Sequence, residues 1–401
     1  MPRPSRFRGR TRSRAGTRKG TSGRTRRGTP SRTRATALLC ALVLLLGLSG
    51  CSAVKKAAGK KSPSPSASAS PSGDAAKVTE DHAAAYRDPD TGKLLTADEA
   101  KDPKRVQDVL KRYWTPERVA AAIAATGPVG GAPEPSSAAT AGPVDDPGHE
   151  QISGPAAAPG GGSVGRASPV LPSAGGAIPN ASGKLFFHVP GGRDGTCSAA
   201  AVNSASRRLL ATAGHCVHGG KGGQWMENTM FVAGYRGGTA LNFTAAFPAY
   251  QSRTFTAWIQ EGSQVKYTTE RAFTHDVAFI TTMNGFDGRR IVDKYGGYGI
   301  RTGPYPISPT SVRLLGYPDA FDKGGVEQEC VSDVRLDKAR IAVDCGMGPG
   351  SSGGPWVWKF PNVGWIVGVT STGAIRPAIE QSARFGSDVW TMFQAQAGTA
   401  P

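Results

Sequence analysis

The stretch Gly350-Ser351-Ser352-Gly353-Gly354-Pro355 carries the sharpest chemical signal in the sequence. A serine between glycines lies on a tight turn, where backbone N–H groups can closely approach an oxygen atom of a bound molecule. A plain turn with no chemistry is the alternative interpretation of so short a segment. The turn therefore makes Ser352 a candidate nucleophile only if a base can be found elsewhere in the chain.

The Gly-x-Ser-x-Gly spacing of these residues is also that of a nucleophile elbow in α/β-hydrolases, whose catalytic histidine follows the serine in the chain. All six histidines of this chain precede Ser352: His82, His149, His188, His215, His218 and His275. The chain order therefore excludes the elbow, and a base for Ser352 must lie upstream.

The best candidate for this base is His215, at the end of the apolar run Leu210-Ala211-Thr212-Ala213-Gly214. Cys216 follows directly, and a disulfide there would hold the backbone beside the imidazole. A lone histidine beside a cysteine is more often structural. The competitors His218 and His275 have no comparable motif.

A third group must orient the base, and Asp276 is the candidate because it opens the apolar run Val277–Ile280. A carboxylate at the start of a buried strand is costly unless it accepts hydrogen bonds. Taken alone, Asp276 would be interpreted as an ordinary turn residue.

Together these segments resemble a known family. Thr212–Cys216, Asp276–Ala278 and Gly350–Pro355 each match a motif of the chymotrypsin-like (trypsin-fold) serine peptidases, in the family order His, Asp, Ser. The resemblance covers about residues 183–398. It implies an all-β fold of two six-stranded antiparallel β-barrels, with a catalytic triad in the cleft between them.

The resemblance also implies a role for each matched residue. Ser352 is the nucleophile, His215 its general base and then acid, and Asp276 orients the imidazole. The backbone N–H groups of Gly350 and Ser352 form the oxyanion hole, and Ser371 matches the serine beside the buried aspartate, where the next strand binds substrate backbone. No cofactor and no metal is expected.

Some positions depart from the animal digestive branch of the family. Ser351 replaces the aspartate that pairs with the new N-terminus on activation, and Cys345 lies seven residues before Ser352 rather than four. Together with Gly316-Tyr317-Pro318, this resembles the bacterial branch that includes glutamyl endopeptidases. Those enzymes commonly have a His where this chain has Thr370, so acidic specificity is not supported. The sequence places no pocket Asp for a Lys or Arg substrate either.

Short β-rich runs between turn signals recur from about Gly183, as expected for an antiparallel barrel or sandwich. Within this region only Ser387–Gln396, near the C-terminus, is predicted to be helical. The predicted strands include Leu185–Val189, Met230–Val232, Phe255–Ile259, Val277–Ile280, Val312–Leu315 and Trp365–Val369.

Four cysteines form two close pairs in the sequence and predict disulfides. The family motif implies Cys197–Cys216. Proximity, and a hairpin expected from strands Val326–Leu336 and Ala339–Cys345, predict Cys330–Cys345. A four-ligand zinc site is the alternative, but the tight CxxC spacing of such sites is missing.

The N-terminal region predicts export. Residues 1–61 hold 17 of the 48 Lys and Arg of the 401-residue chain and no acid, so 31 bases remain against 30 acids elsewhere. The body is thus near neutral despite a net charge of +18, and no nucleic-acid partner is expected. The Arg-rich head and the short apolar run Ala37–Leu48 are typical of a signal peptide, residues 1–50.

Leu48-Ser49-Gly50-Cys51 resembles a bacterial lipobox, in which Cys51 would be lipidated and become the mature N-terminus. The alternative is ordinary signal cleavage near Ala53. The lipobox predicts an extracellular protein held on the outer face of the membrane by Cys51 alone, and residues 51–73 then form a flexible tether.

Residues 74–126 are predicted to be a helical pro-segment, with a plain spacer as the alternative. Asp102-Pro103 and Thr115-Pro116 are helix starts. Between them Val106, Val109, Leu110 and Tyr113 form one helical stripe that needs a partner surface. The Gly/Pro/Ala/Ser-rich residues 127–182 are expected to be disordered linker, and the peptidase domain to span 183–398.

The sequence therefore predicts a secreted, monomeric serine endopeptidase that hydrolyses peptide bonds of proteins or peptides through an acyl-enzyme intermediate. The alternative is a catalytically inactive cell-surface binding protein with a peptidase fold. Inactive relatives usually lack a member of the triad, and none is missing here.

Overall fold

The computed structural model describes residues 78–125, 150–156, 181–263, 268–304, 311–359 and 364–401, all within one compact unit, Gly73–Pro401. The predicted signal peptide 1–50, the lipidation site Cys51 and the tether 51–73 lie outside the described residues, as does most of the 127–182 linker.

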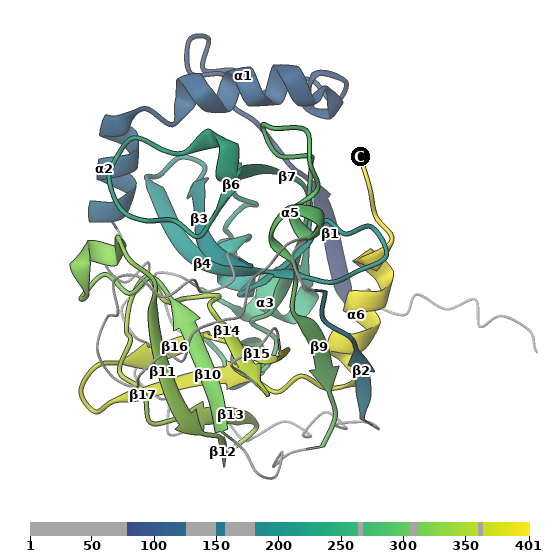
Figure 1. The fold of residues 1–401 in the computed structure, drawn as a ribbon, viewed down its shortest axis with the longest axis vertical. Helices are drawn as coiled ribbons and strands as arrows, with labels where there is room; N and C mark the ends of the chain where they lie inside the picture. The colour runs from purple at the N-terminus through teal and green to yellow at the C-terminus, as the bar shows by residue number, and fades with distance from the viewer. Residues whose placement is uncertain (1–77, 126–149, 157–180, 264–267, 305–310, 360–363) are drawn as a thin grey trace, which may run out of the picture. The chain divides into compact units, whose positions relative to one another are not determined.

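The first half of the peptidase domain is a closed antiparallel barrel (Figure 1). Its strand order is β7-β6-β3-β4-β5-β8, and β7 pairs with β8 to close it. Most residues of these strands are buried, including all nine of β4 and all seven of β6. The strands are β3 (Ser182–His188), β4 (Asp194–Val202), β5 (Leu209–Thr212), β6 (Glu227–Ala233), β7 (Ala246–Phe255) and β8 (Ala278–Thr282).

The second half contains a sheet of order β11-β10-β14-β15-β9-β2 and another of order β12-β13-β17-β16. A core cluster that includes Leu314, Ile341, Trp356 and Val367 draws on strands of both sheets. One pairing departs from the antiparallel expectation, because β9 runs parallel to β15. The strands are β9 (Gly299–Thr302), β10 (Ser311–Gly316), β11 (Gln328–Asp333), β12 (Arg335–Asp337), β13 (Arg340–Val343), β14 (Pro355–Trp358), β15 (Trp365–Val369), β16 (Thr372–Ala374) and β17 (Ile379–Ala383).

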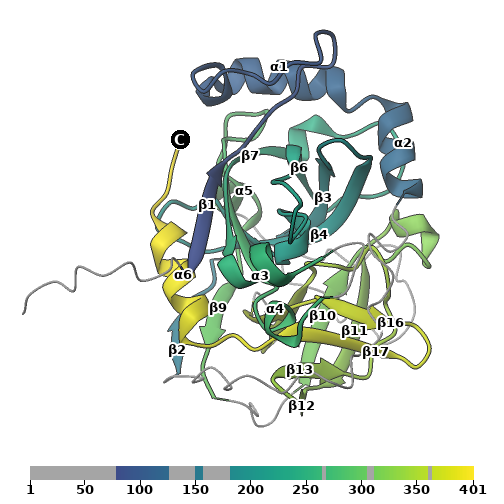
Figure 2. The same cartoon turned by 180° about the vertical axis from the view of Figure 1, so that it is seen from behind.

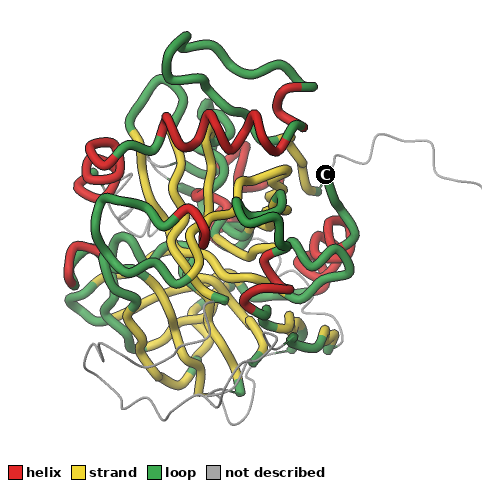
Figure 3. Tube along the Cα trace, turned by 45° about the horizontal axis from the view of Figure 1, so that its top comes forward, coloured by secondary structure: helices red, strands yellow, loops and turns green. Residues whose placement is uncertain are grey.

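Helices lie around the strands (Figure 3). The predicted C-terminal helix is confirmed as α6 (Ser387–Ala397). Shorter ones are α3 (Thr256–Glu261), α4 (Glu270–Phe273), α5 (Ile291–Tyr295) and the 3-10 turns η2 (Gly214–Cys216), η3 (Phe243–Ala245) and η4 (Asp322–Gly324). Among the described helices, none has the length and apolar character needed to span a membrane.

The expected strand Phe255–Ile259 is wrong. Strand β7 ends at Phe255, and α3 begins at the next residue. A short apolar run does not distinguish helix from strand by itself. Here the helix buries Ala257 and Trp258 together, and the indole Nε1 of Trp258 donates to the carbonyl of His218 at 2.9 Å.

Both predicted disulfides are present. Cys197–Cys216 joins β4 to the turn that carries His215, and Cys330–Cys345 joins β11 to the residues after β13. Each closes a short loop, of 19 and 15 residues, and such bridges stabilise mainly by restricting the unfolded chain.

The segment before the peptidase domain packs on the first barrel (Figure 2). Strand β1 (Thr79–Ala83) pairs antiparallel with β7. The two helices begin where their caps predict: Asp102 accepts from the Lys104 N–H at the start of α1 (Pro103–Tyr113), and Thr115 accepts from the Arg118 N–H at the start of α2 (Pro116–Ala124). A 3-10 turn, η1 (Glu99–Lys101), precedes α1.

The helical stripe finds its partner surface on the barrel. All four stripe residues are buried, and they share one core cluster with the outward-facing barrel residues Phe186, Met230 and Val232. Trp114 is 2% exposed, and its Nε1 donates to the carbonyl of Asn228 at 3.0 Å. The segment is therefore built into the barrel's packing.

Polar contacts anchor the same segment. The hydroxyl of Tyr113 donates to Asp194 of β4 at 2.8 Å, and Arg118 pairs with that carboxylate at 3.0 Å. Arg87 pairs with Glu227 of β6 at 2.8 Å. Because Asp194 and Glu227 belong to the barrel, these pairs fix the segment's position on it.

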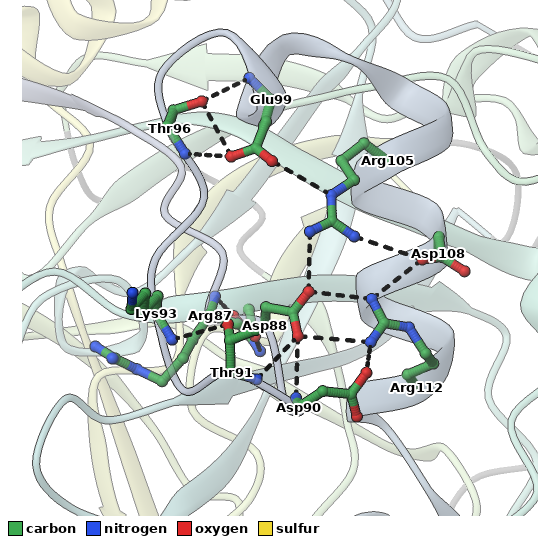
Figure 4. Close-up of polar contacts among 11 residues, drawn as sticks. Arg87, Asp88, Asp90, Thr91, Lys93, Thr96, Glu99, Arg105, Asp108 and Arg112 are labelled. Atoms are coloured by element: carbon green, nitrogen blue, oxygen red, sulfur yellow. Dashed lines mark hydrogen bonds and ion pairs between the residues drawn. The ribbon is translucent and has the colours of Figure 1, made fainter.

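Asp88 organises a cluster of charges within the segment (Figure 4). Arg105 and Arg112 donate to its carboxylate at 2.9 and 3.1 Å, and the N–H groups of Asp90 and Thr91 add two further bonds. The Arg112 hydrogen bond, with these others, lowers the pKa of Asp88 to about 2, against the opposing effect of burial.

The 127–182 linker is not irregular throughout. Residues 150–156 contain strand β2 (Gln151–Ser153), which pairs antiparallel with β9. The short polar stretch gave no strand signal, because its pairing partner lies about 150 residues further along the chain. Strand β3 likewise begins at Ser182, just before the expected boundary at 183.

We predict that Trp114→Ala destabilises the whole peptidase domain. Removing a buried tryptophan side chain from a shared core typically costs about 3–5 kcal/mol. Thermal unfolding followed by circular dichroism should show one transition at a clearly lower Tm. Lys104→Ala, an exposed position on the same helix, is the control. An unchanged Tm in Trp114→Ala would mean that the segment is a dispensable spacer.

We also predict an acid-dependent contribution from Asp88. Because its folded-state pKa lies below the ordinary 3.8, its ionised form stabilises the fold above pH about 4, and this stability is lost as pH falls toward 2. Asp88→Asn should lower the Tm at pH 7 by about 2–4 °C and have little effect at pH 2. An equal loss at both pH values would contradict the charge-based explanation.

Candidate active site

His215 lies in the turn that follows β5 of the first barrel. Strand β5 ends at Thr212, and the 3-10 turn η2 carries the histidine. The disulfide from Cys216 to Cys197 fixes this turn to β4. The ring of Trp258 lies 5.9 Å from the imidazole, centroid to centroid. The His215 side chain keeps 15% of its surface exposed, so a substrate can reach it.

Asp276 lies two residues before the first residue of the buried strand β8, with Val277 between them. The Asp276 side chain is 1% exposed. Its Oδ2 lies 2.8 Å from His215 Nδ1, and its Oδ1 accepts from the backbone N–H of His215 at 2.8 Å. The hydroxyl of Ser371 donates to Oδ2 at 2.6 Å. Three donors thus compensate the desolvation of one buried carboxylate.

These contacts also determine the tautomer of the imidazole. An ionised carboxylate only accepts hydrogen bonds, so Nδ1 of His215 carries the proton and donates it to Asp276. Nε2 is then the acceptor nitrogen of the neutral ring. This nitrogen is the ring atom that can take up a proton, and it is not the one that contacts Asp276.

The Ser352 turn depends on glycines at two positions. Gly350 has φ +88°, and a Cβ there would lie 2.5 Å from the carbonyl of Tyr317. Gly353 has φ +76°, and a Cβ there would lie 2.0 Å from Oγ1 of Thr212. No other residue type fits both the left-handed backbone and the space. The glycines therefore serve the close packing of the turn.

Several bonds place this turn beside the other site residues. The N–H of Ser198 on β4 donates to the Ser352 carbonyl at 2.7 Å, and its hydroxyl donates to the Gly350 carbonyl at 3.0 Å. The N–H of Gly353 donates to the carbonyl of Thr370, the neighbour of Ser371, at 2.7 Å. Ser352 thus lies between β4, which the Cys197–Cys216 disulfide joins to the turn of His215, and the residues Thr370 and Ser371 between β15 and β16.

Of the two adjacent serines, Ser352 is the accessible one. Ser351 is 1% exposed, and its hydroxyl donates to the Gly348 carbonyl at 2.6 Å. Ser352 is half-buried. Within the described chain, the backbone N–H groups of Gly350 and Ser352 have no hydrogen-bond acceptor. Two unpaired donors beside a reachable hydroxyl can bind an oxygen atom of a ligand.

A buried lysine lies under the same turn. Lys184 of β3 is fully buried, and its Nζ donates to the Gly324 carbonyl at 2.9 Å. Burial lowers the pKa of Lys184 to about 8, and the negative charge of Asp319 opposes this effect. The N–H of Asp319 in turn donates to the carbonyl of Pro349 at 2.8 Å. This loop therefore packs against the turn at Pro349 and Gly350.

One grouping of possible metal ligands occurs in the described residues: Cys197, His215 and Cys216. Both sulfur atoms are joined in a disulfide, so they cannot act as thiolate ligands. The predicted zinc alternative to the disulfides is therefore not supported by this arrangement.

Sequence reasoning missed two residues at the site. Trp258 was assigned to a strand, although its ring lies beside His215. Glu380 on β17 accepts from the N–H groups of Met347 and Gly348, at the beginning of the Ser352 turn. No local motif marks Glu380, because its closeness to the turn arises only from strand pairing.

Comparison with known proteins finds similarity among solved structures. No protein-family model and no curated protein matches this chain. A thermostable serine protease, AL20, from an extremophilic microorganism is 27% identical, covering 55% of this chain and 99% of that one, with a TM-score of 0.48.

Two further structures show the same pattern. The protease Anisep from Arthrobacter nicotinovorans is 25% identical over 55% of this chain and 98% of that one, with a TM-score of 0.47. A Glu endopeptidase is 18% identical over 56% and 93%, with a TM-score of 0.44. Because these TM-scores lie below 0.5, we take the fold from its strand pairings. By their descriptions, the three structures are a serine protease, a protease and a Glu endopeptidase.

Proposed function

We propose that this protein is a serine endopeptidase in which Ser352 is the nucleophile, His215 the general base and Asp276 the residue that orients it. The observation that carries the proposal is the buried Asp276 carboxylate, which accepts from the imidazole, the backbone N–H of His215 and the hydroxyl of Ser371. These contacts hold a partly exposed histidine in one tautomer, which is what a general base requires and what a purely structural aspartate would not explain.

The proposed reaction is acyl transfer to a serine. Ser352 Oγ attacks the carbonyl carbon of a peptide bond while Nε2 of His215 takes its proton, and Asp276 stabilises the resulting imidazolium. The N–H groups of Gly350 and Ser352 bind the oxyanion. His215 then gives the proton to the leaving amine, and an acyl-enzyme remains. Water activated by the same histidine releases the acid product.

An inactive binding protein with a peptidase fold is the alternative. A binding protein of this kind would not need an accessible serine at position 352. Ser352 is nevertheless only half-buried, whereas its neighbour Ser351 is 1% exposed.

Secretion remains part of the proposal. Two disulfides in the domain support it, because such bridges persist outside the cytoplasm. A lipid anchor at Cys51 is proposed on the sequence pattern alone.

We predict that a fluorophosphonate labels the protein at Ser352. Ser352→Ala should abolish labelling and lower kcat on a casein or peptide substrate by roughly four to six orders of magnitude. Ser351→Ala is the matched control. It should keep the label, because the Ser351 hydroxyl of the wild type already donates to the Gly348 carbonyl and is not the proposed nucleophile. Circular dichroism checks that each variant is folded. Labelling of Ser352→Ala, or none of the wild type, would refute the assignment.

A further inference from the structure

Glu380 is a buried carboxylate for which the mechanism has no use. It is fully buried on β17, and its Oε1 accepts from the N–H groups of Met347 at 3.0 Å and Gly348 at 2.7 Å. Its Oε2 is also buried and has no hydrogen-bond partner among the described residues. A buried carboxylate oxygen without a partner is costly, so this atom indicates a place for an external donor.

The position of Glu380 relative to Ser352 follows from two connections. Gly348 begins the turn that reaches Ser352 four residues later, so the carboxylate contacts this turn directly. Glu380 also pairs across the sheet with Gly373 of β16, the strand that follows Ser371. The carboxylate therefore lies between the two segments that flank the proposed nucleophile.

Gly373 leaves this carboxylate approachable. A Cβ on Gly373 would lie 1.9 Å from Oε2 of Glu380 and would clash with it, so only glycine fits at this position next to the carboxylate. Gly373 itself is half-buried and is reached by solvent. The unpartnered oxygen thus lies directly beneath an accessible strand residue that has no side chain.

We propose that Glu380 is a specificity-determining residue that binds the cationic side chain, Lys or Arg, of the substrate residue whose carbonyl Ser352 attacks. The inference rests on the proposed function and adds the substrate class. A guanidinium or ammonium supplies both the charge and the N–H donors that Oε2 lacks. An acidic residue would bring two carboxylates together, and an apolar one would leave Oε2 unsatisfied.

No cation of the protein takes this role in the described residues. Arg340, on the neighbouring strand β13, instead donates to Glu270 at 3.1 Å and to the side chain of Gln381 at 3.0 Å. Burial raises the pKa of Glu380 to about 8, and the N–H groups of Gly348 and Met347 offset only part of this effect. A bound cation would favour the ionised form, so it should bind more tightly as pH rises through 8.

The main test compares peptide substrates that differ only in the residue before the cleaved bond: Arg, Lys, Leu or Glu. The wild type should prefer Arg and Lys. In Glu380→Gln, kcat/KM for these two should fall about 10- to 100-fold, while that for Leu changes less than about threefold. Glu327→Gln is the matched control, because burial also raises the pKa of that carboxyl, to about 7, yet it bonds to Ser182 rather than to the Ser352 turn.

A second measurement requires neither catalysis nor Glu380→Gln. Benzamidine, a cationic probe, is titrated calorimetrically into Ser352→Ala at pH 7 and pH 9. Tighter binding at pH 9 supports the inference, whereas no binding, or equal binding at both values, overturns it. A wild type that takes the fluorophosphonate label but prefers Leu or Glu overturns the inference and leaves the proposed function standing. A wild type without the label overturns the function, and the substrate assignment with it.

Discussion

The site depends on one buried carboxylate. Asp276 lies at the start of a strand in the first barrel, and its oxygens accept from His215 of the same barrel and from Ser371 of the second half. Because a desolvated carboxylate needs every one of these donors, it fixes the two halves in one relative position. Ser352 lies close to this junction, because the N–H of Gly353 donates to the carbonyl of Thr370, the neighbour of Ser371.

The glycine-rich turn follows from the same constraint. It must pass between β4 on one side and the loop that contains Tyr317 and Asp319 on the other, and Gly350 and Gly353 allow both contacts. The hydroxyl of Ser198 bonds to the Gly350 carbonyl and thereby holds that peptide. Packing alone therefore holds the backbone N–H groups of Gly350 and Ser352 in position. The turn does not require a charged side chain next to Ser352 to keep this shape.

The segment 78–125 packs on the first barrel through a strand and a helix. Its strand β1 pairs with β7 at the edge of the barrel's sheet. The indole of Trp114 is buried in one hydrophobic cluster with barrel residues and donates to the carbonyl of Asn228. Removing the segment would expose apolar side chains such as Phe186 and Met230 to water. The segment therefore forms part of the barrel's hydrophobic packing.

The sequence alone determined the features that are locally encoded. His215, Asp276 and Ser352 were predicted because their three short segments together resemble the motifs of one family in its chain order, and the structure brings Asp276 Oδ2 to 2.8 Å from Nδ1 of His215. The helix caps Asp102 and Thr115 are local in the same sense. Tertiary structure alone decided the helix at Trp258, the pairing of β2 with β9 and the position of Glu380 beneath Gly373. These depend on partners far along the chain, and no local pattern records a contact between distant strands.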